Sequence, residues 1–343
     1  MKMKNLLVTG IVSFLLSGCG EKVLKGFNYT DYGYNYKRHS VFMTDVSKED
    51  VKRMKNIGSN SISIIPTLYM DSLGSTVLRD DFSPTDESLR NIIRKSRKKG
   101  LEVMLKPHVD FSDSRSRSEI RFFDDSSWKA WFLSYERFIM KYLKIAGEEK
   151  VKLFCIGTEL EGTVERPEWH SIISDARKIY RGKLTYASNY PTEEHCRVPF
   201  WNELDYIGID LYPYIRINWG DVTPERIEFV LERDKVFENL FKFSAGIGKK
   251  ILITEWGYKY KSPEGDETWN WISDKQPSEK DQEAYYLAFA RQIKKQKELK
   301  KDFIKGYFVW VWHPESKDYQ DKFCPRNQPA EKILKDFYND NLN

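Results

Sequence analysis

The sequence predicts a single-domain (β/α)8 barrel, also called a TIM barrel, and three observations support this fold class. Short β-rich runs alternate with longer helical patterns after residue 26, which is typical of a parallel sheet, and there are eight such runs, the number of strands in the barrel. Several runs are almost continuously hydrophobic, as expected for strands that are covered on both faces. The first run continues as "NYTDYGYNYKR", without the glycine-rich phosphate turn of many doubly wound open sheets, so we favour the barrel over that alternative.

The expected strands and helices follow one another in a regular order. The strands are residues 26–33, 61–66, 101–109, 151–159, 184–190, 204–212, 250–258 and 305–314. Helix signals such as Ser47 before Asp50, and glycines where the helical patterns end, place helices between them. The expected helices are residues 47–58, 83–100, 128–145, 168–180, 224–243, 279–299 and one after Pro329. The segment after the fifth strand is too short and irregular to predict a helix.

The N-terminus has the features of a secretory signal. A positive start is followed by a mainly apolar run at residues 6–16, which is shorter than the roughly 20 residues that a membrane-spanning helix needs. The following "LLSGC" resembles the lipobox of bacterial lipoproteins and implies that Cys19 is lipidated after removal of residues 1–18. We therefore expect a tether at residues 19–25, a catalytic domain at 26–343, and membrane contact through the N-terminal lipid alone. Gly20 stands where inner-membrane retention uses aspartate, which favours an outer-membrane place in the cell envelope.

Composition and charge exclude several function classes. The chain is 40% hydrophobic and 15% aromatic, which suffices for a large core. Removal of residues 1–18 takes away Lys2 and Lys4 and lowers the formal net charge from +5 to +3, which is close to neutral for this size. The basic runs at 94–100 and 294–302 end helical patterns, where cations complement the helix dipole, so no nucleic-acid partner is expected. No CxxC or HExxH spacing indicates a metal site, and no cofactor is expected. Cys196 and Cys324 lie in loop-like sequence and could pair in an oxidising compartment.

The predicted strands end in carboxylates and aromatic residues. In a barrel of this class the C-terminal strand ends form the active site. Two carboxylates that face each other across a cleft are what acetal hydrolysis needs, and aromatic rings suit the apolar faces of sugars. The strand ends therefore predict an enzyme that acts on an oligosaccharide or polysaccharide. The polar and aromatic residues at these ends are His108, Glu159, Glu161, Asn189, Asp210, Tyr212, Tyr214, Glu255, Trp256, Trp310, Trp312 and His313.

Five motifs at the predicted strands resemble a known family. "IGTELEG", "ILITEWGY" and "GYFVWVW" look like clan A retaining glycoside hydrolases, and with "MLKPHVD" and "DYIGIDLYPY" they are most similar to glycoside hydrolase family 113, known for β-mannanases. The resemblance covers residue 26 to about residue 313 and implies Glu159 as acid/base and Glu255 as nucleophile. It also implies double-displacement cleavage, with retention, of β-mannosidic linkages in mannan or manno-oligosaccharides. Thr158 stands where the clan usually has asparagine, which leaves open how the sugar 2-hydroxyl is held.

Further residues at the strand ends are expected to bind substrate. They are His108, Asn189, Tyr212, Trp256, Trp310 and Trp312. Tyr212 could bind the nucleophile, and one of Trp310 and Trp312, which share a strand face, is expected to be the floor of the sugar subsite. Trp312 lies nearer the strand end. Glu161 is expected to be a rim charge or a subsite contact.

Two alternatives remain open from sequence. The first is a noncatalytic glycan-binding lipoprotein on the same scaffold, against which the presence of both glutamates argues. The second is the same chemistry on another β-linked hexose polymer, since a fold does not identify its substrate. Endo or exo action and the oligomeric state are also left open.

Overall fold

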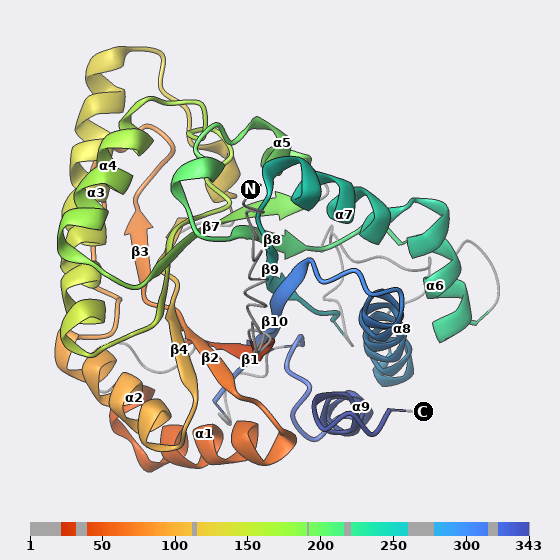
Figure 1. Ribbon diagram of the computed structural model, residues 1–343. Helices are drawn as coiled ribbons and strands as arrows, with labels where there is room; N and C mark the ends of the chain where they lie inside the picture. The colour runs from red at the N-terminus through yellow and green to blue at the C-terminus, as the bar shows by residue number, and fades with distance from the viewer. Residues whose placement is uncertain are drawn as a thin grey trace, which may run out of the picture.

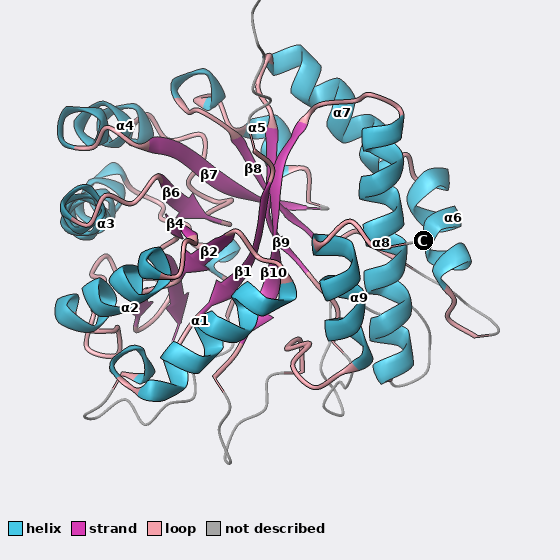
Figure 2. Cartoon of the chain, turned by 60° about the horizontal axis from the view of Figure 1, so that its bottom comes forward, coloured by secondary structure: helices cyan, strands magenta, loops and turns pink. Residues whose placement is uncertain are grey.

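A closed barrel of eight parallel strands forms the centre of the molecule, with helices packed around it (Figures 1 and 2). The computed structural model describes residues 22–31, 40–111, 115–190, 192–215, 221–259, 278–314 and 322–342. Within these residues the predicted fold class is confirmed. The strands, in barrel order, are β1 (Leu24–Tyr29), β10 (Ile304–Trp312), β9 (Ile251–Trp256), β8 (Ile207–Leu211), β7 (Lys183–Tyr190), β6 (Leu153–Thr158), β4 (Glu102–Leu105) and β2 (Ser61–Ile64).

Two prolines divide the second and third predicted strands. Proline donates no backbone hydrogen bond, so the strand ladder is interrupted at Pro66 and Pro107. Beyond them the chain continues as a separate two-stranded parallel sheet of β3 (Thr67–Met70) and β5 (His108–Phe111). His108 is therefore the first residue of an extension at the C-terminal end of β4. In this extension it pairs with Thr67.

Helices follow the strands in the expected order. The prediction for 224–243 divides into two helices at Asp234 and Lys235, and the segment after the fifth barrel strand holds only a short helix. The helices are α1 (Asp45–Ile57), α2 (Asp86–Lys98), α3 (Asp125–Glu148), α4 (Glu168–Ile179), α5 (Glu194–Arg197), α6 (Pro224–Arg233), α7 (Val236–Ile247), α8 (Glu279–Glu298) and α9 (Pro329–Tyr338). Short 3-10 helices are η1 (Val41–Met43), η2 (Arg117–Glu119) and η3 (Trp201–Glu203).

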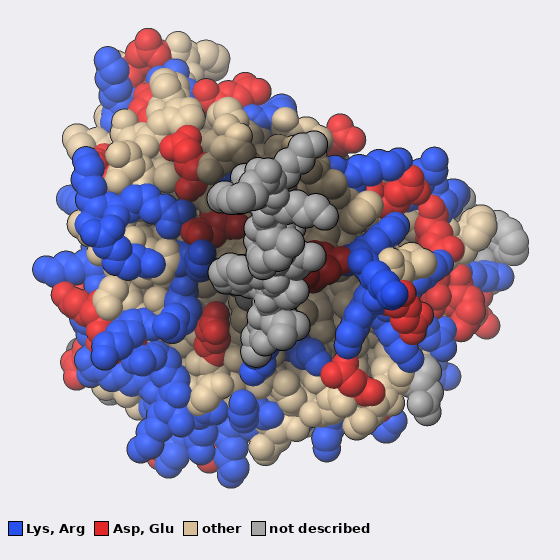
Figure 3. Space-filling view, in the orientation of Figure 1, with Lys and Arg blue, Asp and Glu red and all other residues tan. Residues whose placement is uncertain are grey.

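The two basic runs end helices, as the sequence predicts. Lys95, Arg97 and Lys98 occupy the last turn of α2, and Lys295 and Lys297 that of α8. Figure 3 shows Lys and Arg side chains gathered over α2 and beside α8, with Asp and Glu side chains among them. The basic charge is therefore mixed with acidic charge at these helix ends.

The N-terminal predictions fall outside the described residues. This applies to the signal at 1–18, to the lipidated Cys19 and to most of the tether. Among the described residues, no helix is long and apolar enough to cross a membrane.

The expected pairing of Cys196 with Cys324 is wrong in this structure. Neither cysteine is in a disulfide bond: Cys196 is exposed on α5, whereas Cys324 is buried and its Sγ accepts from the backbone N–H of His313. Cys155 is buried in β6, as predicted.

Candidate active site

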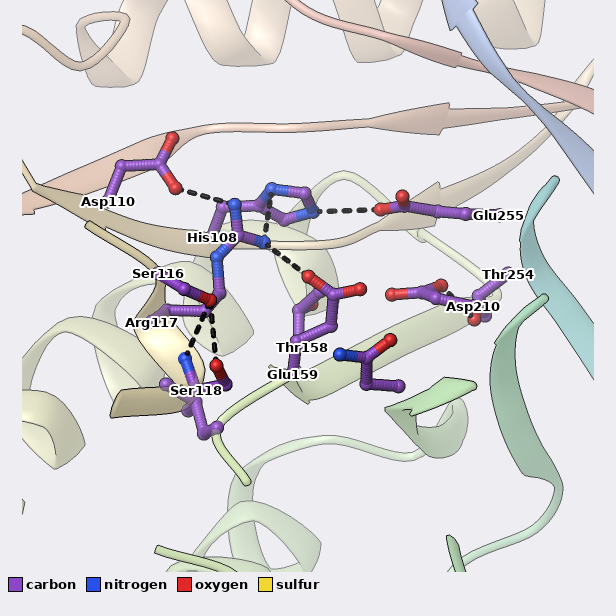
Figure 4. Close-up of polar contacts among 12 residues, drawn as sticks. His108, Asp110, Ser116, Arg117, Ser118, Thr158, Glu159, Asp210, Thr254 and Glu255 are labelled. Atoms are coloured by element: carbon purple, nitrogen blue, oxygen red, sulfur yellow. Dashed lines mark hydrogen bonds and ion pairs between the residues drawn. The ribbon is translucent and has the colours of Figure 1, made fainter. Parts of the chain in front are cut away.

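Three carboxylates from three barrel strands meet at the C-terminal end of the barrel. Glu159 directly follows β6, Asp210 lies in β8 and Glu255 lies in β9. One carboxylate oxygen of each lies within 4.8 Å of the others, and Figure 4 shows the three side chains pointing toward one another. Asp210 and Glu255 are register partners on neighbouring strands, which explains their proximity.

Lys106 supplies the positive charge between two of these carboxylates. Its ammonium group is fully buried, binds Oε1 of Glu255, and lies 3.2 and 3.3 Å from the two oxygens of Asp210. Burial lowers the pKa of Lys106, but the charges of Asp210 and Glu255 outweigh this effect and raise it. Carboxylate clusters can also bind metal ions, but here a lysine ammonium already fills this role between Asp210 and Glu255.

The carboxylate of Glu255 is bound at both oxygens. Tyr212 donates a hydrogen bond of 2.9 Å to Oε2, while Lys106 binds Oε1. The expected contact of Tyr212 with Glu255 is therefore present. Thr254 donates a hydrogen bond of 2.7 Å to the neighbouring Asp210, whose pKa is raised well above its usual range by burial and by the charge of Glu255.

His108 is a neutral side chain with a fixed tautomer. Arg117 lies with its Nη1 3.0 Å from Nδ1 of His108, and because a guanidinium group only donates, Nδ1 must accept. The ring proton is then on Nε2, which lies 3.5 Å from Oε1 of Glu255. Burial and the charges of Arg117 and Lys106 hold the pKa of His108 well below its usual value. His108 therefore presents an N–H group to the site near Glu255.

Glu159 has the raised pKa that a proton donor needs. Its side chain is 18% exposed, and burial raises its pKa to about 7, with the charge of Glu255 adding to this effect. Arg117 opposes it from 3.7 Å. Glu159 and Glu255 therefore have different surroundings. Glu159 is partly buried beside a guanidinium group, and Glu255 is bound by a lysine and a tyrosine.

Asn189 lies beside this cluster at the end of β7, where it pairs with Asp210. It is 2% exposed, and its side-chain Oδ1 has no hydrogen-bond partner among the described residues. Its backbone N–H donates to Glu194 of α5 at 2.6 Å. An unpartnered buried acceptor beside the carboxylates is available to a substrate hydroxyl.

The prediction that Trp256 binds substrate is wrong. Successive side chains of a strand point to opposite faces, so Glu255 points into the barrel and Trp256 points outward. Its ring is fully buried and stacks on Phe289 of α8, with ring centroids 3.8 Å apart. Trp256 belongs to the packing between the barrel and α8.

Trp310 and Trp312 have different roles, although the sequence predicts a shared face. Phe27 of β1 pairs with Val309 of β10, and Tyr29 pairs with Trp312, so β10 contains one extra residue and its alternation is broken. Trp310 is partly exposed and stacks on His108, with ring centroids 5.6 Å apart and planes within 5° of parallel. Trp312 is fully buried, edge-on to Phe27 at 5.2 Å. Trp310 therefore faces the site, and the expectation that Trp312 binds substrate is wrong.

Two neighbours of Glu159 have polar contacts of their own. Glu161 accepts a hydrogen bond of 2.6 Å from Arg197 and is a charge on the rim. Thr158 is buried, and its hydroxyl lies 3.4 Å from the carbonyl of Pro107. Thr158 therefore contacts the backbone next to His108.

Three residues of the cluster were not predicted. Lys106 follows the apolar run "VML" at the end of β4, and a lysine directly after a buried strand is a signal that could have identified it. Arg117 lies in η2 and Glu194 in α5, two short helices after strands, where no periodic pattern marks them. Only the folded chain brings these two residues to Glu159.

The sequence matches a known family over most of its length. Residues 30–328 match the model of Glycoside Hydrolase Family 113. The chain belongs to glycoside hydrolase family 113. A comparison with curated proteins finds no match.

Solved structures of family 113 enzymes share the fold. A structure described as a complex of a GH113 β-1,4-mannanase is 24% identical, with a TM-score of 0.73, covering 93% of this chain and 99% of that chain. AaManA, a GH113 β-mannanase from Alicyclobacillus acidocaldarius in complex with ManMIm, is 21% identical, with a TM-score of 0.73 and coverage of 93% and 97%. A family 5 mannosidase from Rhizomucor miehei is 14% identical, with a TM-score of 0.57 and coverage of 94% of each chain. Family 113 membership makes this protein a glycoside hydrolase, and these likenesses agree with its barrel.

Proposed function

We propose that the protein cleaves β-mannosidic linkages in mannan or manno-oligosaccharides, with retention of anomeric configuration. The observation that carries this proposal is the pair Glu159 and Glu255, whose nearest oxygens lie within 4.8 Å in a family 113 barrel. Retaining glycosidases have carboxyl groups about 5–5.5 Å apart, whereas inverting enzymes need about 6.5–9.5 Å to admit a water molecule. The β-mannanases among the structural neighbours support the choice of sugar.

In the first step Glu159 is the acid and Glu255 the nucleophile. Glu159 gives its proton to the glycosidic oxygen as the bond from that oxygen to the anomeric carbon breaks. An oxygen of Glu255 forms a bond to the same carbon, which produces a glycosyl-enzyme ester. Lys106 and Tyr212 hold the attacking carboxylate in one orientation, so little reorganisation is needed during the attack.

In the second step Glu159 is the base. The ester has no negative charge, so the contribution of Glu255 to the raised pKa of Glu159 is lost, while the lowering effect of Arg117 remains. Glu159 is therefore more acidic in the intermediate and is ionised for its second task. It takes a proton from water, whose oxygen attacks the anomeric carbon and releases Glu255.

Three further side chains are placed to bind the sugar. Trp310 offers a ring face that His108 backs on its other side, and the neutral His108 offers an N–H group. Asn189 offers its unpartnered oxygen next to Asp210. Thr158 is bonded toward Pro107, so we assign contact with the sugar 2-hydroxyl to Asn189.

The decisive experiment is hydrolysis of a panel of mannans, glucans and aryl glycosides by the wild type, Glu159→Gln and Glu255→Gln. Cleavage of mannans by the wild type alone is expected. No cleavage of any mannan would refute the substrate, and full rates in both variants would refute the mechanism. NMR of the first product should show the β-anomer, and an α-anomer would exclude Glu255 as nucleophile.

We also propose that Cys19 is lipidated and that the protein is anchored in the cell envelope, at the outer membrane where the host has one. The apolar run at residues 6–16 followed by "LLSGC" supports this. Mass spectrometry of the mature N-terminus should find an acylated cysteine, and Cys19→Ala should leave the protein in the soluble fraction. An N-terminus that starts elsewhere, or an unmodified Cys19, would refute the anchor.

A further inference from the structure

The turn that carries Glu159 is held on both sides by β7. Glu159 has a φ of +51°, a left-handed conformation that costs a residue with a side chain about 1 kcal/mol or more and needs support from its surroundings. Its backbone N–H donates to the carbonyl of Ala187 at 2.8 Å. The next N–H, of Leu160, donates to the hydroxyl of Tyr186 at 2.9 Å. One of the two supports is therefore a side chain.

Tyr186 is fixed in place by its surroundings. Its ring is fully buried, with ring centroids 5.5 Å from Trp169 and 5.6 Å from Phe200. A Cβ at Gly157 would lie 2.7 Å from an atom of this ring, so the ring reaches the turn only because residue 157 has no side chain. These contacts fix the ring of Tyr186 but not the orientation of its hydroxyl group.

Glu194 sets that orientation. The hydroxyl of Tyr186 donates to Oε1 of Glu194 at 2.5 Å, and the backbone N–H of Asn189 donates to Oε2 at 2.6 Å. The side chain is fully buried, and no Lys or Arg of the described residues forms an ion pair with it. Burial raises the pKa of Glu194 to about 8, against the lowering effect of its two hydrogen bonds. Burying a carboxyl group without a cation costs free energy, and the hydrogen bonds from Tyr186 and Asn189 offset part of this cost.

We propose that Glu194 is a positioning residue for Glu159. It acts through Tyr186 on the turn of the acid/base and through Asn189 on the end of β7. This inference rests on the proposed acid role of Glu159. Both oxygens of Glu194 can accept a hydrogen bond whether the carboxyl is ionised or protonated, whereas a glutamine of the same shape has only one acceptor. Its NH2 group would face either the hydroxyl of Tyr186 or the N–H of Asn189. Glu194→Gln therefore breaks one of the two contacts without leaving a cavity.

The predicted defect is specific to substrates with poor leaving groups. A sugar leaving group must be protonated by Glu159 as it departs, whereas dinitrophenolate leaves without a proton. If Glu194 positions the acid, its loss slows cleavage of a manno-oligosaccharide and spares cleavage of its dinitrophenyl glycoside. A general loosening of the fold would slow both substrates alike.

The experiment compares kcat/KM of Glu194→Gln and Tyr186→Phe on these two substrates, because kcat/KM reports the glycosylation step. On the oligosaccharide we expect a fall of about tenfold to hundredfold, part of the roughly 10²–10⁴-fold that general acid catalysis supplies. On the dinitrophenyl glycoside we expect a change below about threefold. Tyr135→Phe is the matched control: Tyr135 is a buried tyrosine 5.7 Å from Trp169 whose hydroxyl donates to the carbonyl of Ile156 at 2.7 Å, outside the turn. It should leave the ratio of the two rates unchanged.

Glu159→Gln distinguishes failure of the acid role of Glu159 from failure of the positioning role of Glu194. In Glu159→Gln, kcat/KM on the oligosaccharide must fall much more than kcat/KM on the dinitrophenyl glycoside. If it does not, the acid role of Glu159 and this proposal fail together. If Glu159→Gln shows the dependence but Glu194→Gln and Tyr186→Phe keep wild-type ratios, only the positioning role is overturned. Equal losses on both substrates in the two positioning variants, or a shifted ratio in Tyr135→Phe, would also overturn it.

Discussion

The guanidinium group of Arg117 lies 3.7 Å from Oε2 of Glu159 and also donates a hydrogen bond to His108. Burial raises the pKa of Glu159 to about 7, and Arg117 lowers it. In the proposed mechanism Glu159 must be protonated for glycosylation, so kcat/KM should fall as the pH rises through about 7. Replacing Arg117 by methionine removes the lowering effect, so this alkaline limb should move to higher pH. The pH profile of kcat/KM on a manno-oligosaccharide measures the shift.

Arg117→Lys is the control for this prediction because it keeps the positive charge. Its alkaline limb should stay nearer the wild-type position than that of Arg117→Met. A limb that moves to lower pH in Arg117→Met would contradict the electrostatic role of the arginine.

The hydrogen bond from Tyr212 to Glu255 should affect all substrates equally. A hydrogen bond to a charged group contributes about 1.5–3 kcal/mol, so Tyr212→Phe should lower kcat/KM by roughly tenfold to hundredfold. The nucleophile attacks whatever the leaving group, so the oligosaccharide and its dinitrophenyl glycoside should lose the same factor. Steady-state kinetics on both substrates test this, and a loss confined to the oligosaccharide would be inconsistent with it.

The two tryptophans Trp310 and Trp256 should respond differently to replacement by alanine. Trp310 stacks on His108 and is partly exposed, so Trp310→Ala should raise KM, by about tenfold if the lost sugar contact contributes about 1.4 kcal/mol. Trp256 is buried against Phe289, so Trp256→Ala should lower the free energy of unfolding by about 3–5 kcal/mol. Kinetics and denaturant unfolding of both variants separate the two effects. A normal KM in Trp310→Ala would remove this ring from the subsite.

Removing Lys106 should destabilise the protein. In Lys106→Met, Asp210 and Glu255 would face each other without their shared cation, and breaking a buried ion pair costs about 3–5 kcal/mol. Denaturant unfolding measures the loss. The double variant Lys106→Met with Asp210→Asn should recover part of it, since one of the two carboxylates is then neutral. If the single variant unfolds at the wild-type denaturant concentration, the ammonium does not hold the site together.

Glu194 should also make stability depend on pH. Its pKa is about 8 in the folded protein, above the ordinary value of 4.5, so the folded state binds a proton more tightly than the unfolded state. The stability from this group is complete below about pH 4.5 and is lost as the pH rises toward 8. The free energy of unfolding of Glu194→Gln should fall less between these pH values than that of the wild type. Equal slopes would show that Glu194 titrates normally.

The barrel was predictable because strand count and strand hydrophobicity are properties of the chain itself. Glu159 and Glu255 were predictable for the same reason, since both lie where an apolar run ends. Pro66 and Pro107 divide runs that read as single strands, and proline chemistry explains that division. The sequence therefore predicts where the strands lie and which residues stand at their ends.

One wrong prediction concerns alternation within a strand, and the others concern relations between segments. Trp256 was misplaced because its neighbour Glu255 already points inward, and alternation could have excluded it. Trp312 was misplaced because the extra residue of β10 is visible only in its register with β1. Arg117 and Glu194 act from short helices whose positions depend on the whole fold. The positions of Trp312, Arg117 and Glu194 thus depend on contacts between segments rather than on patterns within a segment.

The extra residue in β10 means that strand length decides how many aromatic rings meet the sugar. In an unbroken ladder Trp310 and Trp312 would pair with Asn28 and Thr30, and both rings would lie on one face of the strand. With the extra residue, one ring meets the ligand while the other anchors β10 against Phe27. A residue inserted into β1 between Phe27 and Tyr29 would restore one-to-one pairing and place both rings on one face without changing either tryptophan. Insertions and deletions in β1 or β10 therefore change which aromatic rings face the sugar.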